Sequence, residues 1–250
     1  MRQSDRLDSI LARLSEDGSV AVTGLARELG VSMATIRRDL ELLESQRLLS
    51  RTHGGAVSHG VLYELPLRYR TGRHEAEKHR IAEAAATRLG DARVVGFTGG
   101  TTTTEVARRI AGRTLTVVTN ALNIASELAV RPNLKLVVTG GVARPESYEL
   151  VGPLADATLD GLNIDVVFVG VDGASRAGMT THHEVEAHTN RRMIERARRV
   201  VVVCDASKIG RAALAVICTA RDVDELITDE GAGEAGLDEL RAAGVHVISV

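Results

Sequence analysis

Apolar and polar positions alternate with the period of a helix near the start of the chain. The apolar positions lie at i, i+3, i+4 and i+7 and would form one buried face: Leu7, Ile10, Leu11 and Leu14. The pair Asp17-Gly18 is a typical end for this helix. A shorter helix is expected to begin at Thr23, as its N-cap, and to run through Leu29, with Gly30 in the turn that follows.

A third helical pattern follows Ser32, whose hydroxyl can accept a hydrogen bond from an unpaired N–H at the helix start. Three residues at helical spacing make its buried face: Ile36, Leu40 and Leu43. Thr35, Arg37 and Arg38 fall away from the core on the first two turns. Because a guanidinium can bond guanine or neutralise a phosphate, this arrangement predicts a helix-turn-helix whose second helix reads the major groove of DNA.

Behind this helix the sequence predicts a β-hairpin, which we call the wing. Gly54-Gly55 suits the tip of a hairpin, where a positive φ is needed. Arg51 and His53 would lie on the wing near DNA phosphates. The charge of residues 1–60 is balanced, with eight Lys/Arg and eight Asp/Glu, so a basic surface for DNA would be local. It would consist of Arg37, Arg38, Arg47 and Arg51.

Farther along, β-branched apolar runs alternate with helical patterns. The four valines at 200–203 are typical of a strand buried on both faces, which predicts a parallel sheet covered by helices. The expected strands are Arg93–Phe97, Leu115–Thr119, Leu134–Thr139, Val166–Val171, Val200–Cys204, Glu225–Thr228 and Val245–Ser249. The expected helices include His74–Leu89, Thr102–Ala111, Ala121–Val130, Glu184–Ala197 and Gly233–Ala243.

The chain is therefore expected to have two domains. Residues 1–57 would form a small winged helix-turn-helix domain, and residues 75–250 an α/β domain with a parallel sheet covered by helices. The segment 58–74 contains Gly60, Pro66 and Gly72 and has no clean period, which indicates a linker.

Composition narrows the class of protein. The 250 residues are 44% hydrophobic and 26% charged, as in a globular protein, and the net charge of −2 excludes a strongly polybasic chain. No apolar run approaches the roughly eighteen residues that span a bilayer, and the charged N-terminus has no signal-peptide core, so a cytoplasmic protein with no membrane partner is expected. Cys204 and Cys218 form no C-x-x-C pair, so neither a zinc site nor a disulfide is indicated, and Cys204 should be buried.

Polar residues follow the predicted strands where each strand ends. The first such turn runs from Gly99 to Thr103 and leads into a helix, so glycine backbone, helix N–H groups and threonine hydroxyls could hold an anion. It has neither the G-K-[ST] of a nucleotide loop nor a G-x-G-x-x-G. Taken alone, such a turn is more often only a helix cap.

Four further strand ends strengthen the prediction, since the carboxyl ends of parallel strands meet at one edge of the sheet, which we call the rim. They contribute Asn120, Gly141, Asp172-Gly173 and Lys208. This set suits a phosphorylated polyol. Lys208 and the turn Thr101–Thr103 would hold the phosphate, while Asn120 and Asp172 would bind hydroxyls.

Two motifs in the first domain carry a family resemblance. The run V-S-x-x-T-I-R-R-D-L at Val31–Leu40 and R-x-H-G-G-A at Arg51–Ala56 resemble the DeoR family of bacterial regulators of sugar metabolism. The resemblance continues from about Glu64 to Thr228 through GGTTT, VVTN, TGG, VGP, VDG and DASK, at 99–103, 117–120, 139–141, 151–153, 171–173 and 205–208.

The resemblance implies an effector domain with the fold of pentose-phosphate isomerases and CoA-transferase-like proteins. It further implies an operator-DNA partner, a phosphorylated sugar effector and a homodimer or homotetramer. The residues expected to bind DNA are Ser32, Thr35, Arg37, Arg38, Arg51 and His53. The residues expected to bind the effector are Gly99, Gly100, Thr101, Thr102, Thr103, Asn120, Gly141, Asp172, Gly173, Glu186 and Lys208.

The chain departs from the family pattern at several positions. Thr98 stands where aspartate is common, Asn190 replaces a usual lysine, and His182-His183 replace a usual Pro-Asn. The first two departures remove charges near the expected pocket, so the preferred ligand can differ from that of other members. Arg47 stands where a glycine usually follows the recognition helix.

Some of these residues could also serve other functions. His182, His183 and His188 lack the H-E-x-x-H spacing of a zinc site, so no metal is expected, although they could make ligand binding depend on pH. A sugar-phosphate isomerase could use Asp172, Glu186 and Lys208, but would have no use for a DNA-binding domain. A CoA-transferase would need a distinctive acyl-accepting glutamate. We therefore expect a repressor that is not an enzyme, with no catalytic residue and no cofactor.

Overall fold

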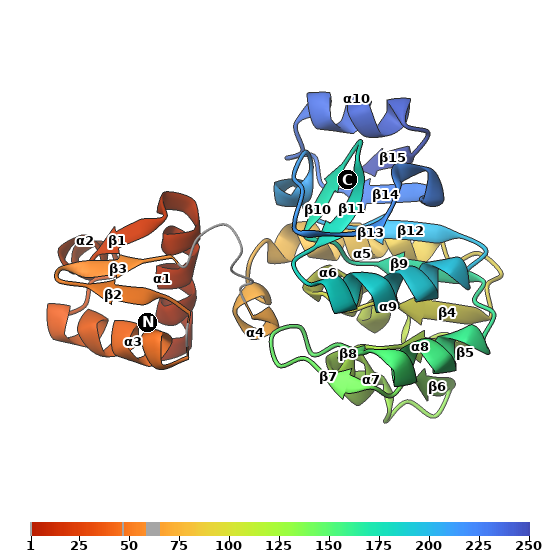
Figure 1. The fold of residues 1–250 in the computed structure, drawn as a ribbon, viewed down its shortest axis with the longest axis horizontal. Helices are drawn as coiled ribbons and strands as arrows, with labels where there is room; N and C mark the ends of the chain where they lie inside the picture. Colours follow the sequence, from red (N-terminus) through yellow and green to blue (C-terminus); the bar gives the residue numbers. More distant parts are fainter. Residues whose placement is uncertain (1, 47, 59–65) are drawn as a thin grey trace. The chain divides into compact units, whose positions relative to one another are not determined.

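The start of the chain folds into three helices, in which apolar residues recur at helical spacing (Figure 1). These are α1 (Gln3–Asp17), α2 (Val22–Glu28) and α3 (Met33–Ser45). The computed structural model describes residues 2–46, 48–58 and 66–250 and divides into two units, Met1–Arg70 and Thr71–Val250. The first unit also holds a small antiparallel sheet in the order β1-β3-β2, made of β1 (Ser19–Ala21), β2 (Ser50–Thr52) and β3 (Gly55–Val57).

The expected apolar positions form the core of this unit. Buried residues of the three helices pack with Leu48, Leu49 and Ala56 of the wing segment. Gly18 ends α1 in the left-handed conformation, and Gly30 has a φ of +63° in the turn before α3, as expected. Each is a position where an L side chain would be strained.

Two expectations for this unit were wrong in detail. The N-cap of α2 is Ala21 and makes no side-chain bond, while Thr23 lies inside the helix. Neither Gly54 nor Gly55 has a positive φ. Gly55 is needed instead for a close approach of strands, because a Cβ there would lie 1.8 Å from the carbonyl oxygen of Val20.

Part of the segment predicted as a linker is helical. Residues 59–65 lie outside the described residues, and α4 (Leu67–Arg70) follows them. Leu67 is buried, Tyr69 packs against the core of the first unit, and the Tyr69 hydroxyl donates to Gln46. The domain limits 57 and 75 remain a prediction.

The second unit is built on a seven-stranded parallel sheet in the order β15-β14-β12-β9-β4-β5-β6. The strands are β4 (Val94–Phe97), β5 (Leu115–Thr119), β6 (Leu134–Val138), β9 (Val166–Val169), β12 (Val200–Val203), β14 (Glu225–Thr228) and β15 (His246–Ser249). All seven had been predicted, with ends that differ by at most two residues. The chain winds outward from β4 in one direction and from β9 in the other, so the sheet has a topological switch point between these strands.

Helices cover both faces of the sheet, because alternate residues of each strand point to opposite sides. Val201 and Val203 pack with the helices α5 (Glu75–Thr87), α6 (Thr101–Ile110) and α7 (Leu122–Leu128). Val200 and Val202 pack on the other face with α8 (Pro153–Asp160), α9 (Glu184–Glu195) and α10 (Glu234–Ala242). The architecture confirms the expected fold class, an α/β domain preceded by a winged helix-turn-helix.

Several smaller elements had not been predicted. They are α8, the hairpin β7 (Val142–Ala143) with β8 (Leu150–Val151), and a second sheet of β10 (Gly173–Ser175), β11 (Gly178–Thr181) and β13 (Ala215–Cys218). Two short 3-10 helices, Ala206–Lys208 and Ala220–Asp222, complete the unit. Both cysteines are buried. Over the described residues, no helix combines the length and the apolar character that crossing a bilayer requires.

Candidate DNA-binding and effector sites

The start of α3 is fixed by a side-chain cap. Ser32 Oγ accepts a hydrogen bond from the N–H of Thr35 at 3.1 Å and lies 2.9 Å from the Thr35 hydroxyl. The cap satisfies a donor that the first turn leaves unpaired, so the helix begins where the sequence predicted.

Arg37 and Arg38 are exposed on α3, while Ile36, Leu40 and Leu43 are buried beneath it. The helix therefore presents two guanidinium groups and the Thr35 side of its first turn outward. This is the arrangement that a helix-turn-helix uses to contact base edges and phosphates.

The wing carries Arg51 in β2 and His53 in the turn, both exposed. Arg51 is held by α3: its Nη1 lies 3.0 Å from a carboxylate oxygen of Glu41, and its N–H donates to Glu44. An exposed ion pair of this kind is worth about 0–1 kcal/mol, so a DNA phosphate could replace it. Arg47, the fourth member of the expected basic surface, lies outside the described residues.

A buried ion pair supports α3 from behind. Arg6 of α1 donates through Nε and Nη2 to the carboxylate of Asp39, with 3.1 Å between Nη2 and Oδ1. Hydrogen bonding to Asp39 raises the pKa of Arg6. No local pattern predicts this pair, because its two residues lie 33 positions apart in the sequence.

The candidate effector site lies at the switch point, where the ends of β4 and β9 meet. Thr98 accepts a hydrogen bond from the N–H of Gly170 at 3.0 Å, and a Cβ on Gly170 would lie 2.6 Å from the carbonyl oxygen of Gly99. Gly100, with a φ of +130°, leads into α6. Backbone N–H groups of the first α6 turn thus face the place where α/β sheets bind ligands.

The three threonines of this turn are not equivalent. Thr101 is partly exposed, whereas Thr102 and Thr103 are buried. The Thr103 hydroxyl donates to the carbonyl of Gly100 at 3.0 Å, so it is already used inside the helix start. The expected donor role therefore fits the backbone of this turn and Thr101 better than the Thr103 side chain.

The other two glycines expected in the site have close neighbours. A Cβ on Gly141 would lie 2.7 Å from the carbonyl oxygen of Val151, and one on Gly173 would lie 2.5 Å from that of Arg211. Both positions allow backbone segments to pack closely beside the rim.

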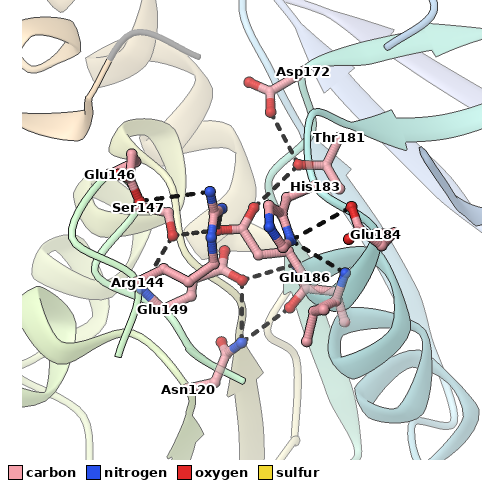
Figure 2. Close-up of polar contacts among 12 residues, drawn as sticks. Asn120, Arg144, Glu146, Ser147, Glu149, Asp172, Thr181, His183, Glu184 and Glu186 are labelled. Carbon is pink, nitrogen blue, oxygen red and sulfur yellow. Dashed lines mark hydrogen bonds and ion pairs between the residues drawn. The ribbon is translucent and has the colours of Figure 1, made fainter. Parts of the chain in front are cut away.

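A loop joining β7 and β8 places polar side chains that the sequence analysis missed (Figure 2). Arg144, Ser147 and Glu149 point from this loop toward α9 and the end of β5. Ser147 and Glu149 are buried, each 4% exposed. The motifs TGG before this loop and VGP after it flank these residues, but neither includes them.

Glu186 of α9 is the centre of the polar contacts in Figure 2. One of its carboxylate oxygens receives hydrogen bonds from Arg144 and from the Ser147 hydroxyl. The other lies 3.3 Å from the Thr181 hydroxyl, which also donates to Asp172 at 3.1 Å. These bonds connect the loop, α9 and the end of β9 in one buried network.

Asn120 and Asn190 form a second part of this network with Glu149. The Asn120 amide donates to Glu149 at 3.2 Å and to the Oδ1 of Asn190 at 3.0 Å, and the Asn190 amide donates to Glu149 at 3.1 Å. All three residues are buried. Asn190, noted as a departure from the family pattern, thus contacts an expected effector residue directly.

Lys208 supplies positive charge at the rim. Its Nζ lies 3.9 Å from Asp172, and its 3-10 helix is capped by Asp205, which accepts from the Ser207 N–H at 3.1 Å. Burial would raise the pKa of the Asp205 carboxyl, but the Ser207 hydrogen bond and the charges of Lys208, His74 and Lys78 outweigh burial and lower it. Asp205 is therefore ionised and holds the Lys208 turn in place.

Two of the histidines near the start of α9 make contacts within the protein. His183 caps α9 by accepting from the N–H of Val185 at 3.2 Å, and the exposed His188 lies 3.4 Å from Asp156. Within the described residues, no group of three or more potential metal ligands occurs. A pocket of about 550 Å³ lies away from the rim, lined by residues around the starts of β12 and β14, among them Val200, Cys218 and Asp224.

A capped helix with exposed arginines, a wing and a separate α/β unit define a DNA-binding transcriptional regulator. Comparison with known families agrees. The DeoR-like helix-turn-helix domain matches residues 6–60, and the DeoR C terminal sensor domain matches residues 73–230. The chain belongs to the DeoR family.

Curated relatives match along nearly the whole chain. The HTH-type transcriptional regulator GlpR of Haloferax volcanii is 35% identical over 99% of this chain and 98% of its own length. The HTH-type transcriptional repressor GlcR of Bacillus subtilis is 31% identical over 99% and 96%. The glycerol-3-phosphate regulon repressor of Escherichia coli K12 is 32% identical, covering 92% of each chain.

Among solved structures, ribose 5-phosphate isomerase A from Methanocaldococcus jannaschii matches 59% of this chain and 57% of its own, with 19% identity and a TM-score of 0.40. A likeness at this level says nothing about chemistry. The three relatives named above are called transcriptional regulators or repressors.

Proposed function

We propose that this regulator represses genes of sugar metabolism and that a phosphorylated sugar, bound at the rim of the second unit, changes its affinity for operator DNA. The observation that carries the proposal is the buried polar network at the switch point. It joins residues of five separate segments beside a helix start and a lysine. Burying so many polar groups costs desolvation free energy that only hydrogen bonding offsets, and a satisfied network of this kind holds its side chains in one arrangement, as a binding site requires.

The rim suits the two ends of a sugar phosphate. Lys208 and the backbone N–H groups at the start of α6 would attract the phosphate. Asn120, Asp172 and Glu186 would face the hydroxyl-bearing part of the ligand. Support for this class of ligand comes from the relative in Escherichia coli K12, whose name refers to glycerol 3-phosphate.

Control of DNA binding needs a second arrangement of the protein that the ligand binds differently. We propose a homodimer or homotetramer, in which two α3 helices enter successive major grooves about 34 Å apart. A near-complete switch requires a difference of about 5.5 kcal/mol between states, which several sites could share. Because operator DNA would be bound in the cytoplasm, the protein would act there.

A short stretch of chain joins the first unit to the first long helix of the second unit. Only residues 71–74 separate Arg70, the last residue of the first unit, from α5. Lys78 of α5 is buried, and its charge is among those that lower the pKa of Asp205, which caps the Lys208 turn. A ligand that moves Lys208 would therefore act on α5 through Asp205.

We propose no catalytic role for the rim. Glu186 accepts hydrogen bonds from Arg144, Ser147 and Thr181, so both of its carboxylate oxygens are already engaged within the protein rather than poised as a base toward a substrate. An isomerase would need such a base near the substrate carbonyl. The absence of any turnover with pentose and hexose phosphates would agree with this proposal, and a measurable isomerisation would contradict it.

A thermal unfolding screen tests the ligand class. The full-length protein is heated with phosphorylated pentoses, hexoses and trioses, each beside its unphosphorylated counterpart. A ligand at one hundred times its Kd stabilises the folded state by about 2.7 kcal/mol. Stabilisation by a phosphorylated sugar but not by its unphosphorylated counterpart supports the proposal. Equal stabilisation by both would show that the protein does not recognise the phosphate group.

A further inference from the structure

Asn120 has an acceptor that nothing in the described part of the chain satisfies. Its side chain is fully buried, yet Oδ1 receives no hydrogen bond from any described residue. A buried acceptor without a donor costs free energy, so such atoms in native proteins commonly meet a water or a ligand. The Asn120 acceptor lies at the end of β5. This strand is next to β4, which borders the switch point together with β9.

The orientation of the Asn120 amide is determined by its neighbours. Its nitrogen donates to Glu149 and to Asn190 Oδ1, both of which can only accept at those atoms. Rotating the amide by 180° would place oxygen against oxygen at both contacts. The acceptor Oδ1 must therefore point away from this pair.

Glu149 brings a second acceptor to the same place. A Cβ on Gly99 would lie 2.3 Å from Glu149 Oε1, so this carboxylate oxygen lies directly against the Gly99 turn. Its other oxygen is occupied by the two asparagine amides. The end of the rim nearest β5 thus offers acceptors. The cation of this loop, Arg144, is engaged by Glu146 and Glu186, so the positive charge on the other side of the Gly99 turn comes from Lys208 beside Asp172.

From this asymmetry we infer that Asn120 Oδ1 and Glu149 form a subsite that accepts hydrogen bonds from O–H or N–H groups of the effector, and so determine its specificity. The inference rests on the proposed function and names the part of the ligand that is read there. The phosphate lies on the Lys208 side of the Gly99 turn, because a dianion beside the Glu149 carboxylate would be repelled. Asn190 is a positioning residue that holds Glu149.

The variant Glu149→Gln tests this subsite, because it keeps the size of the side chain and removes its charge. Binding is measured calorimetrically on the full-length protein, with the phosphorylated sugar that stabilises it most and with inorganic phosphate. The variant should bind the sugar phosphate at least tenfold more weakly and inorganic phosphate within threefold of the unmodified protein. Glu146→Gln, an exposed change in the same loop, is the matched control and should alter neither value.

Two results would overturn the inference. One is unchanged affinity of Glu149→Gln for the sugar phosphate. The other is tighter binding of inorganic phosphate by tenfold or more, since the carboxylate would then occupy the phosphate position. Thermal unfolding of both variants without ligand shows whether they fold.

A second measurement uses the unmodified protein and needs no variant. Glucitol 6-phosphate should bind at least tenfold more tightly than n-hexyl phosphate, which has the same chain length without hydroxyl donors. Equal affinity would contradict the donor-reading subsite. Glucosamine 6-phosphate compared with glucose 6-phosphate separates the two donor types: tighter binding of the amine, lost in Glu149→Gln, identifies an ammonium, and equal binding identifies hydroxyls.

These outcomes are distinct from failure of the proposed function. If no phosphorylated compound binds, or if binding leaves operator affinity unchanged, the proposed function itself is wrong. Sugar phosphates could instead bind and alter operator affinity equally whether or not they carry hydroxyl donors, and equally in Glu149→Gln. In that case only the subsite is wrong.

Discussion

Arg6 and Asp39 form a buried two-point ion pair between α1 and the helix that carries the exposed arginines. Asp39 is 1% exposed, and Gln3 adds a further hydrogen bond to its carboxylate at 3.3 Å. The pair therefore sets the position of α3 relative to α1, although neither residue faces the surface expected to contact DNA.

Removing one partner of this pair should destabilise the first unit strongly. Arg6→Ala leaves the Asp39 carboxylate buried without its main partner, and breaking such a pair costs about 3–5 kcal/mol. Urea unfolding measures the change. The control is Arg13→Ala on the same helix, whose exposed pair with Glu28 should contribute less than about 1 kcal/mol. Equal losses in both variants would contradict the role of the buried pair.

Arg37→Ala and Arg38→Ala should weaken operator binding without unfolding the protein, because both side chains are exposed on α3. Where the side chain reads a base, the loss is about 1–3 kcal/mol. Where it contacts only phosphate, binding should weaken on all sequences and its salt dependence should fall. Fluorescence anisotropy with labelled promoter fragments measures both. Arg109→Ala in the other unit is the control, and full operator affinity in both α3 variants would refute the recognition helix.

The two glycines of the wing provide a matched pair. Gly55→Ala should destabilise the wing by about 2 kcal/mol or more, because the added Cβ would collide with the carbonyl of Val20. Gly54→Ala meets no atom within 4 Å and should change stability by less than about 0.5 kcal/mol. Circular dichroism melting compares the two, and similar melting temperatures would show that β1 and β3 are not so close.

Asp205 should make stability depend on pH in the acid range. Its folded pKa lies below the ordinary value, so its ionised form stabilises the fold above about pH 3.9, and this contribution is lost as the pH falls through the folded pKa. Asp205→Asn should be less stable than the unmodified protein at pH 7, and the difference should shrink below about pH 4. Urea unfolding from pH 3 to pH 7 tests this. The same substitution at exposed Asp91 is the control, and a constant difference for Asp205→Asn would contradict the prediction.

The parallel sheet and its helices could be predicted because their signals are local. Runs such as 200–203 are apolar on both faces, and the cap at Ser32 lies three residues from the N–H it binds. The predicted rim residues follow from the rule that strand ends of a parallel sheet converge.

The contacts that organise the rim could not be predicted in this way. Glu149 is 29 residues from Asn120 and 41 from Asn190, so its role exists only after the sheet and α9 have formed. Gly55 shows the same limit. Its sequence neighbours suggest a turn. The constraint comes instead from a carbonyl next to it in β1, a strand that α2 and α3 separate from Gly55 along the chain.

The central claim is that a phosphorylated sugar on the second unit changes how the first unit binds DNA. The most direct measurement is the affinity of the full-length protein for a promoter fragment of its own operon, at low salt, with and without the stabilising sugar phosphate. We predict a change of at least tenfold that disappears in Lys208→Ala, which should bind the fragment normally without ligand and lose the response to it. The same affinity with and without the ligand, or a full response in Lys208→Ala, would contradict the account.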